Sequence, residues 1–113
     1  LLITDAMEAT GMPDGQYKLG ANQVFVKNRE ARLSDGTIAG STLTMDRAVK
    51  NMIEAVGVPA AEALAMATSS PADAIGEKQR GRLLPGHHAD MVLLDGAYEV
   101  VCTIVGGEVV YQR

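Results

Sequence analysis

The sequence predicts a mixed α/β protein, and three observations support this class. First, 47% of the 113 residues are hydrophobic but only 4% are aromatic, so the core must be built mainly from aliphatic side chains, as is usual in α/β proteins. Second, short apolar segments typical of strands lie near both ends of the chain. Third, apolar residues in the middle recur at three- and four-residue spacing, which predicts an amphipathic helix. The length suits one small domain.

The N-terminal third is expected to be strand-rich. Residues 1–4 are apolar and predict a short buried strand, and residues 11–15 carry the Pro and Gly of a turn. Between residues 17 and 33 apolar side chains alternate with polar ones, which predicts further strands with turns at 21–22 and 27–30.

Helices are expected in the middle of the chain. One apolar stripe predicts a helix over residues 44–56, capped by Thr44 and ended by Gly57. Pro59 favours the start of a second helix, with a small-residue face formed by Ala61, Leu64, Ala65 and Thr68. A third, short helix is expected over residues 70–75, followed by a polar and exposed segment over residues 77–82.

The C-terminal part is expected to be β. Residues 91–94 are continuously apolar, which predicts a strand buried on both faces. Residues 100–105 and 109–111 flank Gly106-Gly107, a good pair for a tight hairpin turn. Cys102 is expected to be a small buried hydrophobe, and a single cysteine allows no internal disulfide, which fits a reducing cytoplasm.

Charge and hydropathy exclude several classes of partner. The net charge is −4 and no segment concentrates Lys and Arg, so nucleic acid and anionic membranes are poor candidates. The apolar runs are far shorter than the roughly 20 residues that span a bilayer. Because the sequence starts within an apolar strand-like segment and has no initiator Met, we expect it to be part of a larger protein.

Asp5 is the strongest candidate for a catalytic residue. It follows the apolar residues 1–4 and precedes a loop of small residues, an arrangement by which barrel enzymes present a catalytic acid or base at the end of a buried strand. The alternative is an Asp that only caps the following turn.

Two other segments invite a functional interpretation. Residues 36–42 resemble a flexible loop in which Ile38, Ala39 and Gly40 offer backbone groups and a small surface to a substrate; the alternative is an ordinary strand-to-helix connection. The adjacent His87 and His88 suggest a metal site, but neighbours on an extended segment point in opposite directions and no third ligand lies nearby. The sequence therefore favours no metal ligands in this chain.

Four segments, residues 2–6, 11–15, 33–45 and 85–95, resemble the N-acetylglucosamine-6-phosphate deacetylases of the metal-dependent amidohydrolase superfamily. The resemblance runs the full length of the chain but covers only the C-terminal part of such an enzyme. The Pro-Gly-x-x-Ala-Asp motif at residues 85–90 is shared by many amidohydrolases, whereas residues 4–6 and 40–45 are more particular to the deacetylases.

The resemblance implies the C-terminal part of a (β/α)₈ TIM-type barrel together with strands of a small β-sandwich. Residues 1–82 would form the end of the barrel domain, with its last strand, an inserted β-hairpin segment and helices; residues 83–113 would be sandwich strands. Asp5 would be the acid/base that takes a proton from metal-bound water and delivers it to the departing amine. Ile38, Ala39 and Gly40 would contact the sugar.

The implied reaction converts N-acetylglucosamine 6-phosphate into glucosamine 6-phosphate and acetate, in amino-sugar catabolism. The implied cofactor is a divalent metal ion of the zinc or iron type, and its His and Glu ligands would lie upstream of this chain, as would the groups that hold the phosphate. The resemblance also implies a cytoplasmic homodimer, and a chain that is inactive by itself. Two alternatives stay open: another metal-dependent amidohydrolase, and a stand-alone, non-catalytic α+β assembly module.

Overall fold

The computed structural model describes all 113 residues and divides them into two units. One unit comprises residues 3–48, and the other comprises residues 1–2 and 49–113. The helix α1 (Met45–Glu54) crosses the boundary between them.

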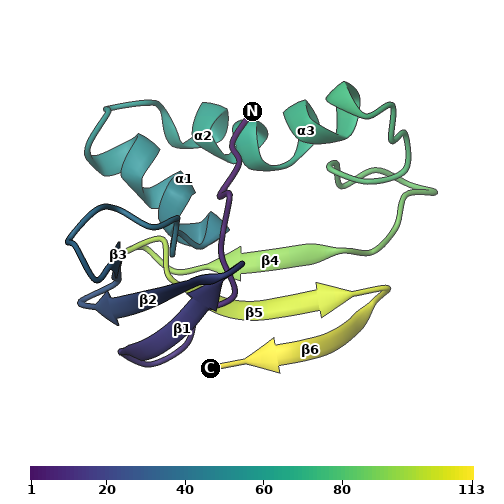
Figure 1. The fold of residues 1–113 in the computed structure, drawn as a ribbon. Helices are drawn as coiled ribbons and strands as arrows, with labels where there is room; N and C mark the ends of the chain where they lie inside the picture. Colours follow the sequence, from purple (N-terminus) through teal and green to yellow (C-terminus); the bar gives the residue numbers. More distant parts are fainter. The chain divides into compact units, whose positions relative to one another are not determined.

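The unit of residues 3–48 contains an antiparallel sheet of three strands in the order β1-β2-β3 (Figure 1). Its strands are β1 (Gly15–Leu19), β2 (Asn22–Lys27) and β3 (Glu30–Leu33). The turn between β2 and β3 uses Asn28 and Arg29 at φ 51° and 65°, the two positive values that a type I′ hairpin turn requires. The strands predicted between residues 17 and 33 are thus confirmed.

The core of this unit is small and aliphatic. Val24 and Val26 alternate with exposed or half-buried residues along β2, as expected for a sheet with one buried face. The buried residues that cluster with them are Met7, Ala9, Ala31 and Ala39, and Tyr17 and Leu33 pack against the cluster. The loop after Asp5 and the segment after β3 therefore share one core with the sheet.

The strand predicted over residues 1–4 is wrong for this structure. These residues pair with no strand, and the side chains of Leu1 and Ile3 are 60% and 74% exposed. A strand requires a neighbour for its backbone groups, and the only backbone bond made here runs from the Leu2 N–H to the Met66 carbonyl. Apolar character alone therefore did not produce a strand.

The helices lie where the sequence predicts them, but the buried face of one helix differs from the prediction. The helix predicted over residues 44–56 forms as the shorter α1, which ends at Glu54; Gly57, at φ 82°, follows two residues that are no longer helical. Two shorter helices follow, α2 (Ala60–Ala67) and α3 (Ser69–Ala74). The small-residue face predicted for α2 is not the buried one: Ala63 is buried, whereas Ala61 and Leu64 of the predicted face are exposed. An Ala-rich helix has little contrast between faces, so spacing fixes its orientation poorly.

The second sheet has the antiparallel order β4-β5-β6 (Figure 1). It consists of β4 (Met91–Leu94), β5 (Val100–Val105) and β6 (Glu108–Gln112), so the hairpin predicted around Gly106-Gly107 is confirmed. The predicted burial of β4 on both faces is wrong, since Val92 and Leu93 are 56% and 47% exposed. Burial on both faces needs a layer on each side of the sheet, and Cys102 is likewise only half-buried.

The mixed content of helices and strands is confirmed, but both sheets are antiparallel. The one parallel contact outside them is an isolated bridge between Ala6 and Ser41. The barrel and the sandwich, with their division at residues 82 and 83, therefore stay predictions. No helix is both long and apolar enough to cross a membrane.

Candidate active site

Asp5 has a left-handed backbone conformation and an exposed side chain, and no buried strand precedes it. Its φ of 49° belongs to the left-handed region, which Asp tolerates better than most residues because its side chain is short and polar. The carboxylate is exposed and has no hydrogen-bond or ion-pair partner in the chain. The side chain therefore stabilises no loop, and its oxygens are open to a hydrogen bond from a ligand.

The loop that follows Asp5 is fixed by the carbonyl of Ser41. The Met7 N–H donates to this oxygen at 2.9 Å, and Thr10 Oγ1 donates to it at 3.2 Å. Ala6 forms the parallel bridge with Ser41. Because Met7 and Ala9 are also buried in the core, Asp5 emerges from an anchored backbone.

The segment of Ile38, Ala39 and Gly40 presents mainly one side chain. Ile38 is 71% exposed and forms an antiparallel bridge with Arg32. Ala39 is 5% exposed, and its N–H donates to the Ala31 carbonyl at 2.9 Å. Core packing and the contact with β3 already occupy the Ala39 side chain and N–H, so a role for Ala39 at the substrate stays a prediction.

Gly40 is required by backbone geometry. Its φ is 127°, a region that side chains with a Cβ rarely adopt, and a Cβ here would lie 3.5 Å from the Met7 Sδ. The distance to Met7 also shows that Gly40 lies next to the loop that follows Asp5. Because 3.5 Å is an ordinary van der Waals contact, the positive φ and not a lack of space favours glycine at position 40.

Hydrogen bonds hold the rest of residues 36–42 in place. Asp35 accepts the Thr37 N–H at 2.9 Å, and this bond lowers the pKa of the Asp35 carboxyl. Arg32 donates to the Gly36 carbonyl at 2.8 Å, and Thr42 donates its hydroxyl to the Arg29 carbonyl. The flexible loop expected from the sequence is instead a segment tied to β3 and to the turn before it.

The structure brings Asp5 close to the segment of Ile38–Gly40 through Ser41, although they lie more than thirty positions apart in sequence. Sequence reasoning missed Thr10 and Ser41 as the residues that make this connection. A hydroxyl that donates to a distant backbone carbonyl has no local sequence signal, and only the fold reveals it.

The chain does not form a metal centre. No three His, Cys, Asp or Glu residues lie close enough together to hold an ion. The His87 N–H donates to the Leu84 carbonyl and closes a turn, whereas the His88 N–H donates to the more distant Gln79 carbonyl. The residues present therefore do not fit the divalent ion that the resemblance implies.

Asp90, in the shared motif of residues 85–90, has a structural environment. Its carboxylate accepts the Gly106 N–H at 2.8 Å and lies 3.2 Å from Arg80 Nε. The bond from Gly106, supported by Arg80, lowers the pKa of Asp90. The Asp90 carboxylate thus connects the residue before β4 to the turn between β5 and β6.

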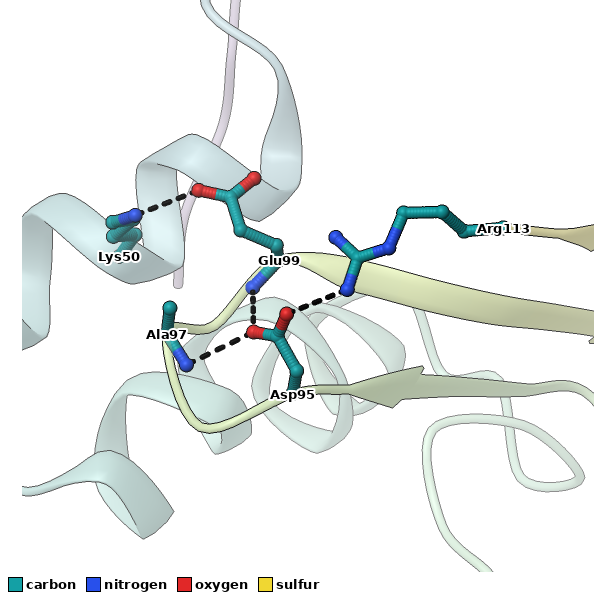
Figure 2. A network of polar contacts seen from close by, with 5 residues as sticks. All are labelled: Lys50, Asp95, Ala97, Glu99 and Arg113. Carbon is teal, nitrogen blue, oxygen red and sulfur yellow. Dashed lines mark hydrogen bonds and ion pairs between the residues drawn. The ribbon is translucent and has the colours of Figure 1, made fainter.

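Asp95 is the centre of a second structural network, shown in Figure 2. Oδ1 accepts the N–H groups of Ala97 and Glu99 at 2.9 and 3.0 Å, and Oδ2 accepts Arg113 at 2.7 Å. The bond from Arg113, followed by those from the two amides, lowers the pKa of Asp95 to about 2. Glu99 pairs with Lys50 of α1 at 2.7 Å. These carboxylates are occupied by protein donors, in contrast to Asp5.

The chain matches a known protein family over most of its length. Residues 26–110 match the Amidohydrolase family, and because the match spans most of the chain, the chain belongs to that family. The resemblance predicted from the sequence is thus confirmed.

The individual relatives are sugar-phosphate deacetylases by name. The chain is 46% identical over 112 residues to N-acetylglucosamine-6-phosphate deacetylase from Vibrio furnissii, covering 98% of the chain but 28% of that protein. It is 46% identical over 101 residues to a putative N-acetylgalactosamine-6-phosphate deacetylase from Escherichia coli (strain K12), covering 88% of the chain and 60% of that protein. The chain therefore spans only part of these relatives.

Solved structures agree with these similarities. The crystal structure of N-acetylglucosamine-6-phosphate deacetylase from Thermotoga maritima matches with a TM-score of 0.89 at 42% identity, covering all of this chain and 31% of that one. The enzyme from Pasteurella multocida matches with a TM-score of 0.90 at 31% identity, covering 98% of this chain and 29% of that one.

Proposed function

We propose that this chain is the C-terminal part of an enzyme that hydrolyses N-acetylglucosamine 6-phosphate to glucosamine 6-phosphate and acetate. The observation that carries the proposal is the 46% identity to the Vibrio furnissii deacetylase across 98% of the chain. The position of Asp5 supports it, because an exposed carboxylate without a protein partner lies on an anchored loop beside the Ile38–Gly40 segment. The reaction would belong to amino-sugar catabolism.

In this proposal Asp5 serves as both base and acid. Its carboxylate takes a proton from the water that attacks the acetamide carbonyl, and the oxygen of that water forms the new bond to carbon. The same proton then passes to the nitrogen as the C–N bond breaks, so that acetate and a free amine leave. One carboxylate can perform both steps because it ends each turnover as it began.

Other parts of the proposed enzyme would come from outside this chain. Because no group of residues here fits a metal ion, the ligands of a zinc- or iron-type cofactor would be supplied elsewhere, as would the groups that bind the phosphate. The isolated chain would then be inactive. We also propose a cytoplasmic homodimer and residues 1–82 as the end of a barrel domain, on the resemblance to the deacetylases. A non-catalytic assembly module is less favoured, since a relative named as a deacetylase matches 98% of the chain at 46% identity.

A second candidate substrate is N-acetylgalactosamine 6-phosphate. The Escherichia coli protein named for this activity is as similar to the chain as the Vibrio furnissii protein, at 46% identity. The two sugars differ only in the orientation of the C4 hydroxyl, so both offer the same acetamide to Asp5.

The test is an assay of the purified full-length protein that contains this sequence, loaded with divalent metal. Release of free amine is measured with each of the two N-acetylhexosamine 6-phosphates. We expect hydrolysis of both, with the higher kcat/KM for the gluco isomer. A preference of tenfold or more for the galacto isomer would select the second candidate. A folded, metal-loaded protein that hydrolyses neither sugar would refute the proposed function.

A further inference from the structure

The Ser41 carbonyl accepts two hydrogen bonds from the loop that follows Asp5. Met7 donates its N–H from the near end of the loop, and Thr10 donates its hydroxyl from the far end. We propose that Thr10 is a positioning residue for the hydrolytic reaction, which holds the loop of Asp5 in register with the substrate-contacting segment. This inference rests on the proposed function.

The local fold prepares the Thr10 hydroxyl for this role. The Thr10 N–H donates to the Met7 carbonyl at 3.0 Å, which closes a turn and directs the half-buried Thr10 side chain to Ser41. Between these two contacts Ala9 is 1% exposed in the core. The loop is therefore anchored at both ends to the same oxygen atom.

The orientation of the Asp5 carboxylate depends on this anchored backbone, because no side chain holds the carboxylate. Asp5 makes no side-chain hydrogen bond of its own, and its backbone has the strained φ of 49°. Its orientation is set by the backbone that follows it and not by a neighbouring side chain. Without the Thr10 hydroxyl the loop keeps the Met7 bond, the buried Ala9 side chain and the bond from the Lys18 N–H to Glu8 at 2.7 Å, so only a small shift of the carboxylate is expected. A displacement of about 1 Å can lower a rate on the order of 100-fold.

The segment of Ile38–Gly40 is fixed independently of Thr10. Ala39 donates to Ala31, and the Leu33 N–H donates to the Thr37 carbonyl at 2.8 Å, so β3 holds this segment. Removing the Thr10 hydroxyl should thus disturb the catalytic carboxylate more than the substrate-contacting surface. The expected result is a lower kcat with little change in KM.

The experiment compares Thr10→Val and Thr10→Ser in the full-length, metal-loaded enzyme. Valine keeps the shape of threonine but cannot donate, whereas serine keeps the hydroxyl. We expect Thr10→Val to lower kcat about tenfold with KM within about threefold of the parent value, and Thr10→Ser to restore kcat to within about twofold. Thr68→Val is the matched control, because Thr68 also donates to a backbone carbonyl, that of Leu64 at 2.7 Å in α2.

The outcomes separate a positioning role from a merely structural one. The inference is overturned if Thr10→Val has the kcat of the parent. It is also overturned if Thr10→Val and Thr10→Ser lose kcat equally, or if Thr10→Val and Thr68→Val lose kcat equally. If Thr10→Val does not fold, Thr10→Ala removes the same hydroxyl with a smaller side chain, and a parent-like kcat there has the same meaning. An inactive parent enzyme would instead refute the proposed function, and with it this inference.

Discussion

The guanidinium of Arg113 donates a 2.7 Å hydrogen bond to Oδ2 of Asp95, while the other oxygen of that carboxylate closes the turn between β4 and β5 (Figure 2). The Arg113 N–H also donates to the Val101 carbonyl at 3.0 Å. One carboxylate thus connects the turn at one end of the second sheet with the residue that follows β6. This arrangement leads to a prediction about acid stability.

Protonation of Asp95 should lower the free energy of unfolding as the pH falls from about 4 to about 2. Its folded pKa is about 2, below the ordinary 3.8, so the ionised form is favoured by folding. This contribution is complete above the unfolded pKa and is lost as the pH falls through the folded value. Asp95→Asn should therefore be less stable than the parent at pH 7, and the difference should shrink toward pH 2. Urea unfolding at a series of pH values measures this.

Glu108→Gln is the control for that series. Glu108 is exposed at the start of β6, and its side chain makes no hydrogen bond or ion pair. Its removal should leave the pH dependence unchanged. A difference between Asp95→Asn and the parent that stays constant from pH 7 to pH 2 would contradict the structural role of the ionised carboxylate.

Gly81 should be among the glycines least tolerant of substitution. A Cβ at this position would lie 2.7 Å from the Thr68 carbonyl oxygen and 2.9 Å from the Ala72 Cβ, in addition to the positive φ of 80°. Gly86→Ala is a matched control, since Gly86 has φ 84° but no atom within 4 Å of its added Cβ. We expect Gly81→Ala to lower the free energy of unfolding, measured with urea, by about 1–3 kcal/mol more than Gly86→Ala does. Equal losses would mean that the close packing at Gly81 is absent.

Local patterns predicted those parts of the fold whose stabilising contacts are near in sequence. The strands between residues 17 and 33 follow from alternation and the turn at Asn28 and Arg29. The hairpin of β5 and β6 follows from Gly106-Gly107, and α1 follows from one apolar stripe. In each case the chain supplies both partners within a few residues.

The features that sequence did not predict depend on distant partners. Residues 1–4 look like a strand, but no strand lies beside them. The burial of β4 was overestimated because an apolar run does not say how many layers cover a sheet. For the site, local pattern singled out Asp5 and Ile38–Gly40 and the resemblance gave them roles, whereas the Ser41 carbonyl that connects them is a backbone atom with no sequence signal.

Asp5→Asn in the full-length enzyme should abolish turnover. Asparagine keeps the size of the side chain but cannot take the proton from the attacking water, so kcat should fall by at least about 10²–10⁴-fold. Metal content should stay at the parent value, because this chain holds no ligand cluster. Metal analysis and amine release on the same sample check both statements.

Asp46→Asn is the control, since Asp46 lies in the first turn of α1 and makes no side-chain hydrogen bond. It should keep the parent kcat. An Asp5→Asn enzyme with near-normal turnover would exclude Asp5 as the acid/base, and a loss of metal together with activity would place Asp5 at the ion instead.

Ile38 should contribute to substrate binding through its exposed side chain. If the sugar covers part of this apolar surface, Ile38→Ala should raise KM roughly three- to tenfold, which corresponds to about 1 kcal/mol of lost contact, with kcat within about twofold of the parent. Ile75→Ala is the matched control, because Ile75 is 82% exposed, against 71% for Ile38, and follows α3. Both variants should unfold at the parent urea concentration, since neither side chain is buried. If Ile38→Ala and Ile75→Ala have the same KM, the substrate does not contact the Ile38 side chain. Gly40 would then be the residue of this segment that contacts the substrate.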